Sequence, residues 1–145
     1  MQRVSTLSLK SEAETLSLGA HLARALRPGD VVRLSGDLGA GKTTLARGLI
    51  QSKLGDVEVP SPTYTLVQTY DWDDGELWHC DLYRLDHPND AYELGLIDVM
   101  GEEIVLLEWA DRLGDLCPED ALSVELSFDG EGRVATLKGW GSRDV

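Results

Sequence analysis

Residues 31–44 of this chain read Val31-Val32-Arg33-Leu34-Ser35-Gly36-Asp37-Leu38-Gly39-Ala40-Gly41-Lys42-Thr43-Thr44. The β-branched run at 31–35 predicts a short strand, and the glycines that follow predict a tight turn. From Lys42 onward, apolar residues recur at helical spacing until Gly55, which predicts a helix over 42–54. The stretch therefore predicts a strand, a glycine-rich loop and a helix in direct succession.

The glycine-rich loop carries a phosphate-binding motif. Residues 36–43 match G-x-x-x-x-G-K-[ST] in full, between a predicted strand and a predicted helix as the motif requires. Glycines let successive backbone N–H groups point at an anion, and the positive end of the following helix strengthens that field. Lys42 can reach the β- and γ-phosphates, and the Thr43 hydroxyl can join the shell of a magnesium ion. We therefore expect a nucleoside triphosphate site rather than an unliganded glycine-rich turn.

The remaining sequence predicts further strands and helices around this unit. The capping-box spacing of Ser11 and Glu14 begins a helix that runs to Leu26. The apolar run at 104–107 is typical of a strand buried on both faces of a parallel sheet. We also expect a hairpin of strands 65–70 and 76–83 around a five-residue loop at 71–75, a short helix at 88–96, and a hairpin of strands 121–128 and 133–138. The sum is one α/β domain over residues 1–145, a P-loop NTPase fold whose mixed, mainly parallel central sheet is flanked by helices and antiparallel additions.

The composition is acidic, and the charge is unevenly placed. The 145 residues include 13 Lys and Arg against 26 Asp and Glu, a net charge of -13. Residues 1–55 hold 8 basic and 4 acidic side chains, whereas residues 56–145 hold 5 and 22. This surplus argues against direct binding to nucleic acid or to an anionic membrane, because both depend on Lys and Arg clusters. Anion binding is therefore expected in residues 1–55.

Cysteine use and hydropathy predict a cytoplasmic protein. Cys80 and Cys117 are too few for a disulfide framework and do not form a C-x-x-C pair, so we expect reduced thiols. The first twenty residues lack the apolar core of a secretory signal, and no run of 18 apolar residues predicts a spanning helix.

Two segments beyond the loop are candidates for the metal and phosphate site. Glu108 follows the predicted strand 104–107, where P-loop proteins need an acidic anchor for the metal, bound directly or through a water. The segment 61–65, Ser-Pro-Thr-Tyr-Thr, is rich in hydroxyls. It is either a lid over the γ-phosphate or an ordinary proline loop that leads into a strand.

A polar pattern in the strand 76–83 supplies a third candidate. Because side chains alternate along a strand, His79, Asp81 and Tyr83 share one face, opposite an apolar face that we expect to take the core. This ridge could orient a water, hold a metal ion or bind a partner, or it could simply be solvated. The sequence leaves these alternatives open.

Four blocks of the sequence resemble those of the bacterial TsaE family, formerly YjeE. They lie at 36–44, 61–66, 79–84 and 107–109, in an order and spacing similar to that family over nearly the whole chain. The family is an ATPase required for the threonylcarbamoyl modification of adenosine 37 in tRNAs that read ANN codons, and it works with the TsaD and TsaB proteins. The resemblance implies ATP and Mg²⁺ as ligands, TsaD and TsaB as partners, and contact with tRNA only through those partners.

The resemblance also implies roles for individual residues. The ATP phosphates would lie on Asp37, Leu38, Gly39, Ala40, Gly41, Lys42, Thr43 and Thr44. Mg²⁺ would bind Thr43 and Glu108, and hydrolysis would depend on Asp81 together with Lys42 and Glu108. Further nucleotide contacts are implied for Thr63 in a switch loop, for Trp109 beside the site, and for Glu12, Gly132 and Arg133 on the adenine side.

Other nucleotide-dependent functions share the loop motif. A regulatory GTPase is disfavoured because the sequence has no N/T-K-x-D block to read guanine. A small-molecule kinase usually has a basic lid, and residues 56–145 hold only five basic side chains. A nucleotide-gated interaction module, in which hydrolysis only resets binding, remains open.

Overall fold

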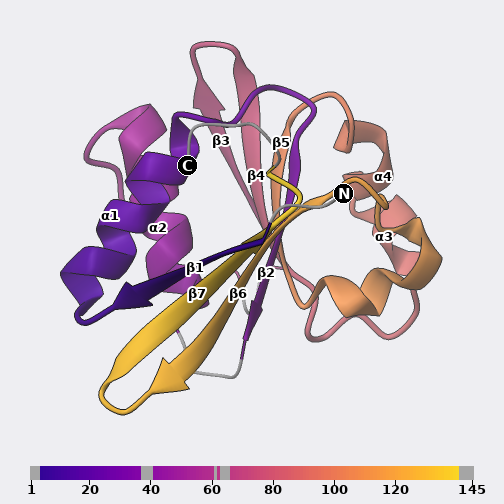
Figure 1. The fold of residues 1–145 in the computed structure, drawn as a ribbon. Coiled ribbons are helices and arrows are strands. Elements are labelled where there is room, and N and C mark those ends of the chain that lie inside the picture. The colour runs from indigo at the N-terminus through magenta and orange to yellow at the C-terminus, as the bar shows by residue number, and fades with distance from the viewer. Residues whose placement is uncertain (1–3, 37–40, 61, 63–65, 141–145) are drawn as a thin grey trace.

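A computed structural model of the chain describes residues 4–36, 41–60, 62 and 66–140. Seven strands form one sheet in the order β1-β7-β6-β2-β5-β4-β3 (Figure 1). The elements along the chain are β1 (Val4–Leu9), α1 (Glu12–Ala23), β2 (Val31–Gly36), α2 (Lys42–Leu54), β3 (Val67–Trp72), β4 (Gly75–Asp81), α3 (Asp90–Glu93), α4 (Leu96–Val99), β5 (Ile104–Glu108), the 3-10 helix η1 (Ala110–Leu116), β6 (Leu122–Asp129) and β7 (Gly132–Lys138).

The centre of the sheet is parallel and its edges are antiparallel. Strands β6, β2, β5 and β4 run parallel to one another. On one side β7 and β1 add in antiparallel pairing, and on the other side β3 adds as a hairpin with β4. The predicted fold class is confirmed, as is the succession of β2, loop and α2. The strand predicted at 104–107 is β5, and all its residues are buried.

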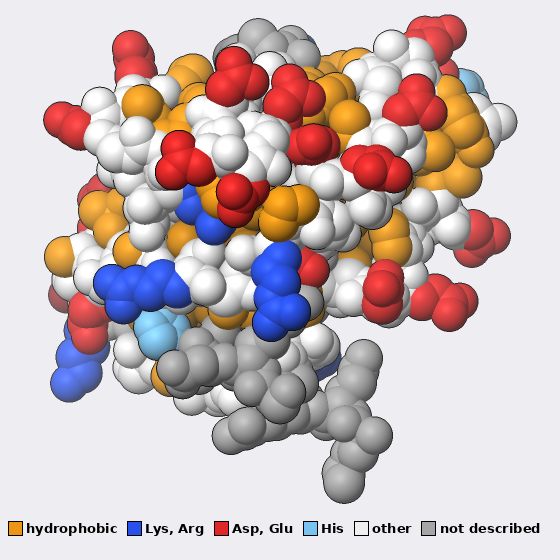
Figure 2. All heavy atoms as spheres, turned by 90° about the horizontal axis from the view of Figure 1, so that it is seen from above, with side chains coloured by type: hydrophobic (Ala, Val, Ile, Leu, Met, Phe, Trp, Pro, Cys, Tyr) orange, Lys and Arg blue, Asp and Glu red, His pale blue; other side chains and the backbone are white. Residues whose placement is uncertain are grey.

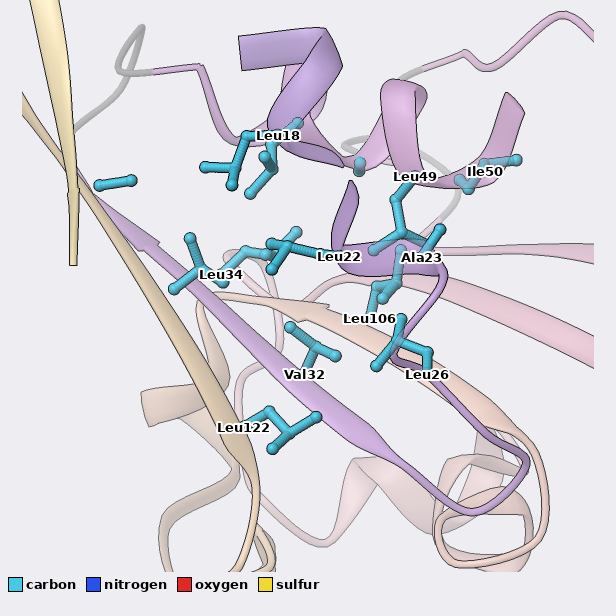
Figure 3. Packing of buried hydrophobic residues seen from close by; sticks show 14 of the residues in the cluster. Leu18, Leu22, Ala23, Leu26, Val32, Leu34, Leu49, Ile50, Leu106 and Leu122 are labelled. Carbon is cyan, nitrogen blue, oxygen red and sulfur yellow. The ribbon is translucent and has the colours of Figure 1, made fainter. Parts of the chain in front are cut away.

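Helices cover both faces of the sheet. On one face α1 and α2 pack against alternate strand residues such as Val32, Leu34 and Leu106, and Figure 3 shows Leu18, Leu22 and Leu49 pointing toward them from the helices. On the other face α3, α4 and η1 cover β4 and β5 (Figure 1). The continuous apolar run of β5 follows from this arrangement, because a strand with helices on both faces has no polar side.

Helices α1 and α2 lie unusually close together. Ser11 caps α1, its side chain accepting a hydrogen bond from the Glu14 N–H at 3.2 Å. Glycines at 19 and 48 meet the backbone of the opposite helix, and a Cβ on Gly48 would lie 2.3 Å from the Leu16 carbonyl oxygen. The two glycines therefore allow a backbone-to-backbone contact that a side chain would prevent.

Two sequence expectations about local structure were wrong, and two elements were missed. The loop between β3 and β4 is a two-residue turn rather than a five-residue loop, because Trp72 pairs directly with Gly75. The helix expected at 88–96 is divided into α3 and α4 by Gly95, whose φ of 78° lies in the left-handed region. Strand β1 and helix η1 were not predicted at all.

Acidic side chains gather on one end of the molecule. Figure 2 looks onto the end that carries the β3–β4 turn, and Asp and Glu side chains outnumber Lys and Arg across it. This end lies away from the carboxyl end of β2 (Figure 1). Within the described residues, no helix is long and apolar enough to cross a membrane. Cys80 and Cys117 are both free thiols.

Candidate functional site

Three strands end at the same edge of the sheet, and each delivers a predicted site residue there. Strand β2 ends at Gly36, where the phosphate motif begins, β5 ends at Glu108, and β4 ends at Asp81. The register pairs Asp81 with Glu108 across β4 and β5, and Leu34 with Glu108 across β2 and β5. Ligands of open α/β sheets bind outside the carboxyl ends of the parallel strands. The structure thus brings the start of the predicted motif and both predicted carboxylates to the place where a ligand is expected.

The first turn of α2 presents its backbone N–H groups at this edge. Gly41 is the N-cap with φ 105° and, as a glycine, has no side chain to cap the helix. A Cβ at Gly41 would meet nothing closer than 3.7 Å, so the left-handed backbone rather than lack of space requires glycine here. The first N–H groups of a helix have no partner within the helix and attract anions. Asp37, Leu38, Gly39 and Ala40, the other predicted phosphate contacts of the loop, lie outside the described residues.

The Lys42 side chain turns back over the start of the motif. Its Nζ donates a hydrogen bond of 2.9 Å to the Gly36 carbonyl oxygen and lies 4.1 Å from the centre of the Trp109 ring. The residue is 6% exposed. The ammonium therefore lies between the Gly36 carbonyl oxygen and the face of the Trp109 ring, both of which attract a cation.

Trp109 has a special backbone conformation directly after β5. Its φ of 59° is positive, which is uncommon for a bulky residue and is a strained state for one. This turn places the Trp109 ring between Lys42 and Tyr83, and the centres of the Trp109 and Tyr83 rings are 5.0 Å apart. The structure therefore places Trp109 beside the lysine of the phosphate motif; the nucleotide contact that the family resemblance implies for Trp109 stays a prediction.

The polar ridge of β4 is not a solvated face. His79 is fully buried at 0% exposure and Asp81 is 5% exposed, whereas Tyr83, beyond the end of the strand, is 45% exposed. The expectation that only the opposite, apolar face takes the core was wrong, because β4 lies inside the sheet between β3 and β5 and is covered on both faces. The Asp81 carboxylate accepts a hydrogen bond of 3.0 Å from the Tyr83 N–H.

His79 contacts the predicted metal anchor. Its Nε2 lies 2.7 Å from Oε2 of Glu108, and the Glu108 side chain is 4% exposed. Sequence reasoning missed this pair, because the contact depends on β4 and β5 being neighbours in a particular register. Glu108 is itself the last residue of β5 rather than an exposed residue after it.

The predicted adenine-side residues come together in a cavity of about 250 Å³. Glu12 from α1 and the β7 residues Gly132 and Arg133 line it beside Gly41 and Thr44 of the phosphate motif. Thr15 also lines this cavity, and sequence reasoning did not single it out. The cavity therefore joins the phosphate motif to residues from both ends of the chain.

The donors at this edge fit magnesium better than a transition metal. Thr43 and Glu108, the predicted ligands, offer a hydroxyl and a carboxylate oxygen, which are hard donors. In the part of the chain that the structure describes, no group of three or more His, Cys, Asp and Glu side chains could form a complete metal cage. Magnesium is commonly held by one or two protein oxygens together with water and phosphate, so this sparse donor set suits it. Thr63 and most of the segment 61–65 lie outside the described residues.

Comparison with known proteins gives consistent matches over most of the chain. A family model described as threonylcarbamoyl adenosine biosynthesis protein TsaE matches residues 9–135. The protein named tRNA threonylcarbamoyladenosine biosynthesis protein TsaE from Rickettsia conorii is 38% identical over 132 residues, covering 90% of this chain and 75% of the relative. The protein of that name from Bacillus subtilis is 35% identical over 133 residues, covering 90% of this chain and 82% of the relative.

The fold agrees with a solved structure as well. The crystal structure of Bacillus subtilis YdiB matches with a TM-score of 0.78 at 28% identity, covering 97% of this chain and 88% of that one. The family model and the structural match each cover most of the chain. On these grounds the chain belongs to the TsaE family of threonylcarbamoyl adenosine biosynthesis proteins.

Proposed function

We propose that this protein binds and hydrolyses ATP with Mg²⁺ to support the threonylcarbamoylation of adenosine 37 in tRNA. The observation that carries the proposal is the meeting of Lys42, Glu108 and Asp81 at one edge of the sheet, beside the uncapped start of α2. Membership of the TsaE family supports the pathway, since its relatives are named for threonylcarbamoyladenosine biosynthesis.

Different residues of the chain bind the phosphates, the metal ion and the nucleoside of ATP in this proposal. Lys42 exchanges the Gly36 carbonyl for phosphate oxygens, and the first N–H groups of α2 hold the same phosphates. Thr43 and Glu108 hold the magnesium ion, which, when bound, neutralises charge on the β- and γ-oxygens. The cavity lined by Glu12, Gly132 and Arg133 receives the nucleoside side of ATP.

Asp81 positions the attacking water. Its carboxylate ends the strand next to Glu108, and its bond from the Tyr83 N–H fixes the side chain from the loop side. An acceptor held beside the γ-phosphate can orient a water in line with the bond that breaks, without being a strong base. Arg84 follows three residues later, and it or a partner's arginine would stabilise the transition state.

The partners in this proposal are TsaD and TsaB, and tRNA is reached only through them. Because turnover by a P-loop protein without a placed arginine is slow, we expect hydrolysis to rise when the partners are added. The net charge of -13 also favours protein partners over direct RNA contact.

An ATPase assay of the protein alone and with TsaB and TsaD tests this proposal, run beside size-exclusion chromatography with ATP. We expect stimulated hydrolysis and co-elution of the three proteins. The proposal fails if the partners neither stimulate hydrolysis nor co-elute.

One observation favours a nucleotide-gated interaction module as the second candidate. A chain of ring contacts leads from Lys42 through Trp109 to the exposed Tyr83, over which Arg112 lies at 5.6 Å from the ring centre. Occupation of the phosphate site by a nucleotide could thereby alter a surface that a partner contacts. In that case a variant that binds ATP without hydrolysing it would still support modification of tRNA for one round per protein.

A further inference from the structure

The buried contact between His79 and Glu108 has no role in the function proposed above. We infer that His79 is a positioning residue for Glu108: its Nε2–H holds one oxygen of this carboxylate and so sets how strongly magnesium increases the affinity for nucleotide. The inference rests on the proposed function for the identity of the ligand. The pairing itself is a property of the protein alone.

The geometry leaves little freedom to either side chain. The two residues come from adjacent parallel strands, and the register places His79 opposite Leu106, two residues before Glu108. The Nε2 to Oε2 distance is 2.7 Å, the short separation typical of a hydrogen bond to a carboxylate. Because the His79 side chain is 0% exposed and the Glu108 side chain 4%, water cannot readily replace either partner.

The other ring nitrogen shows where the proton lies. Nδ1 of His79 is buried and has no hydrogen-bond partner within the described residues. Leaving a buried N–H donor without an acceptor costs more free energy than leaving a buried acceptor nitrogen without a donor. We infer from this geometry that Nε2 is the nitrogen that donates to Glu108, since Nδ1 has no acceptor among the described residues. A carboxylate oxygen accepts this hydrogen bond, so Glu108 is held as an acceptor.

This contact orients the carboxylate toward the site. Oε2 is engaged by His79, so the carboxylate cannot rotate without breaking a buried bond, and Oε1 is not used by that bond. Histidine and carboxylate partners behind a metal ligand typically change metal affinity by about 10–100-fold when they are removed. We therefore expect loss of His79 to reduce the magnesium-dependent part of nucleotide binding and to spare the part that depends on Lys42 and α2.

Calorimetry with a non-hydrolysable ATP analogue, with and without Mg²⁺, tests this division. We compare the wild-type protein, His79→Leu, which removes the donor, and His79→Gln, whose amide nitrogen can replace Nε2. Cys80→Ala serves as the matched control, since Cys80 is equally buried on the same strand but belongs to the opposite face. We expect His79→Leu to lose about tenfold of the affinity gained with Mg²⁺, His79→Gln to recover most of it, and Cys80→Ala to match the wild type. Equal losses with and without Mg²⁺, or no loss, would overturn the inference.

Nitrogen-15 NMR of the unliganded protein tests the pairing without any nucleotide. The chain has three histidines, and His79 is the buried one among them, so its ring signals can be assigned by His79→Gln. We expect a protonated Nε2 and a bare Nδ1, and a shift of both signals in Glu108→Gln. An Nε2 without a proton would refute the inference even if His79→Leu fails to fold. If the wild type shows no effect of Mg²⁺ while the NMR result holds, the proposed function fails and the pairing of His79 with Glu108 stands.

Discussion

The substitution Gly48→Ala should separate α1 and α2, whose residues line the cavity proposed to receive ATP. A Cβ at Gly48 would lie 2.3 Å from the Leu16 carbonyl oxygen and 2.9 Å from the Leu16 Cα, whereas ordinary van der Waals contact begins at 3.4 Å. Since these are backbone atoms, no side chain can rotate away, and α1 must move by about 1 Å relative to α2.

Two opposing terms set the magnitude. Alanine improves helix propensity over glycine by about 1 kcal/mol, and overpacking against backbone costs about 3 kcal/mol at the upper end of its usual range. We therefore expect a net loss of about 2 kcal/mol, which lowers Tm by about 6–8 °C for a chain of this size. Since Glu12 on α1 and Thr44 on α2 line one cavity, the same movement should weaken ATP binding.

Urea unfolding and thermal scans measure the stability, and calorimetry measures ATP binding. Gly55→Ala is the matched control, since it makes the same change at the other end of α2, where nothing lies within 4 Å of the added Cβ. Because Gly55 has a φ of 89°, Gly55→Ala should also lower the stability, through backbone strain, yet it should leave the affinity for ATP unchanged. If Gly48→Ala were as stable as the wild type, the close approach of the two helices would be refuted.

Two further predictions concern buried side chains of β4. Asp81→Asn should bind ATP within about twofold of the wild type but hydrolyse it about 100-fold more slowly in the presence of TsaB and TsaD. The control Asp86→Asn, on the exposed loop after β4, should change neither ATP binding nor hydrolysis. Normal hydrolysis by Asp81→Asn would show that Asp81 has no role in the reaction. Burial raises the pKa of the Cys80 thiol above its ordinary value of 9.0. As the pH rises, the thiol therefore ionises in the unfolded chain before it ionises in the folded chain. The free energy of unfolding should be unaffected below about pH 8 and should fall by up to about 1.4 kcal/mol per pH unit above pH 9. In urea unfolding from pH 7 to 10, Cys80→Ala should flatten this decline more than Cys117→Ala, whose thiol is less buried, and an unchanged slope in Cys80→Ala would contradict the assignment.

The sequence predicted those parts of the fold that local chemistry determines. The glycines and helical spacing around Lys42 specify a strand, a turn and a helix without help from distant residues, and the all-apolar run of β5 indicates a strand with two covered faces. The capping box at Ser11 similarly fixes where α1 begins. In each of these cases the deciding interactions lie within a few residues.

The parts that failed depend on partners far away in the chain. Strand β1 is an edge strand that pairs only with β7, more than 120 residues later, and its short polar-apolar alternation gives little local signal. The role of His79 was left open, with a solvated ridge among the alternatives, because sequence cannot tell that β4 is an inner strand. Its contact with Glu108 depends on the register of β4 and β5, which no local pattern specifies.

The central claim, that the phosphate motif holds ATP, is tested most directly by calorimetric titration of Mg-ATP into the wild-type protein and Lys42→Met. This variant keeps an unbranched side chain of similar size and removes the ammonium that bonds to the Gly36 carbonyl and lies over the Trp109 ring. We predict one ATP bound per wild-type chain and at least a tenfold loss of affinity in Lys42→Met, because a charge-assisted bond to phosphate contributes about 1.5–3 kcal/mol. No binding by the wild type, or equal binding by Lys42→Met, would contradict the claim.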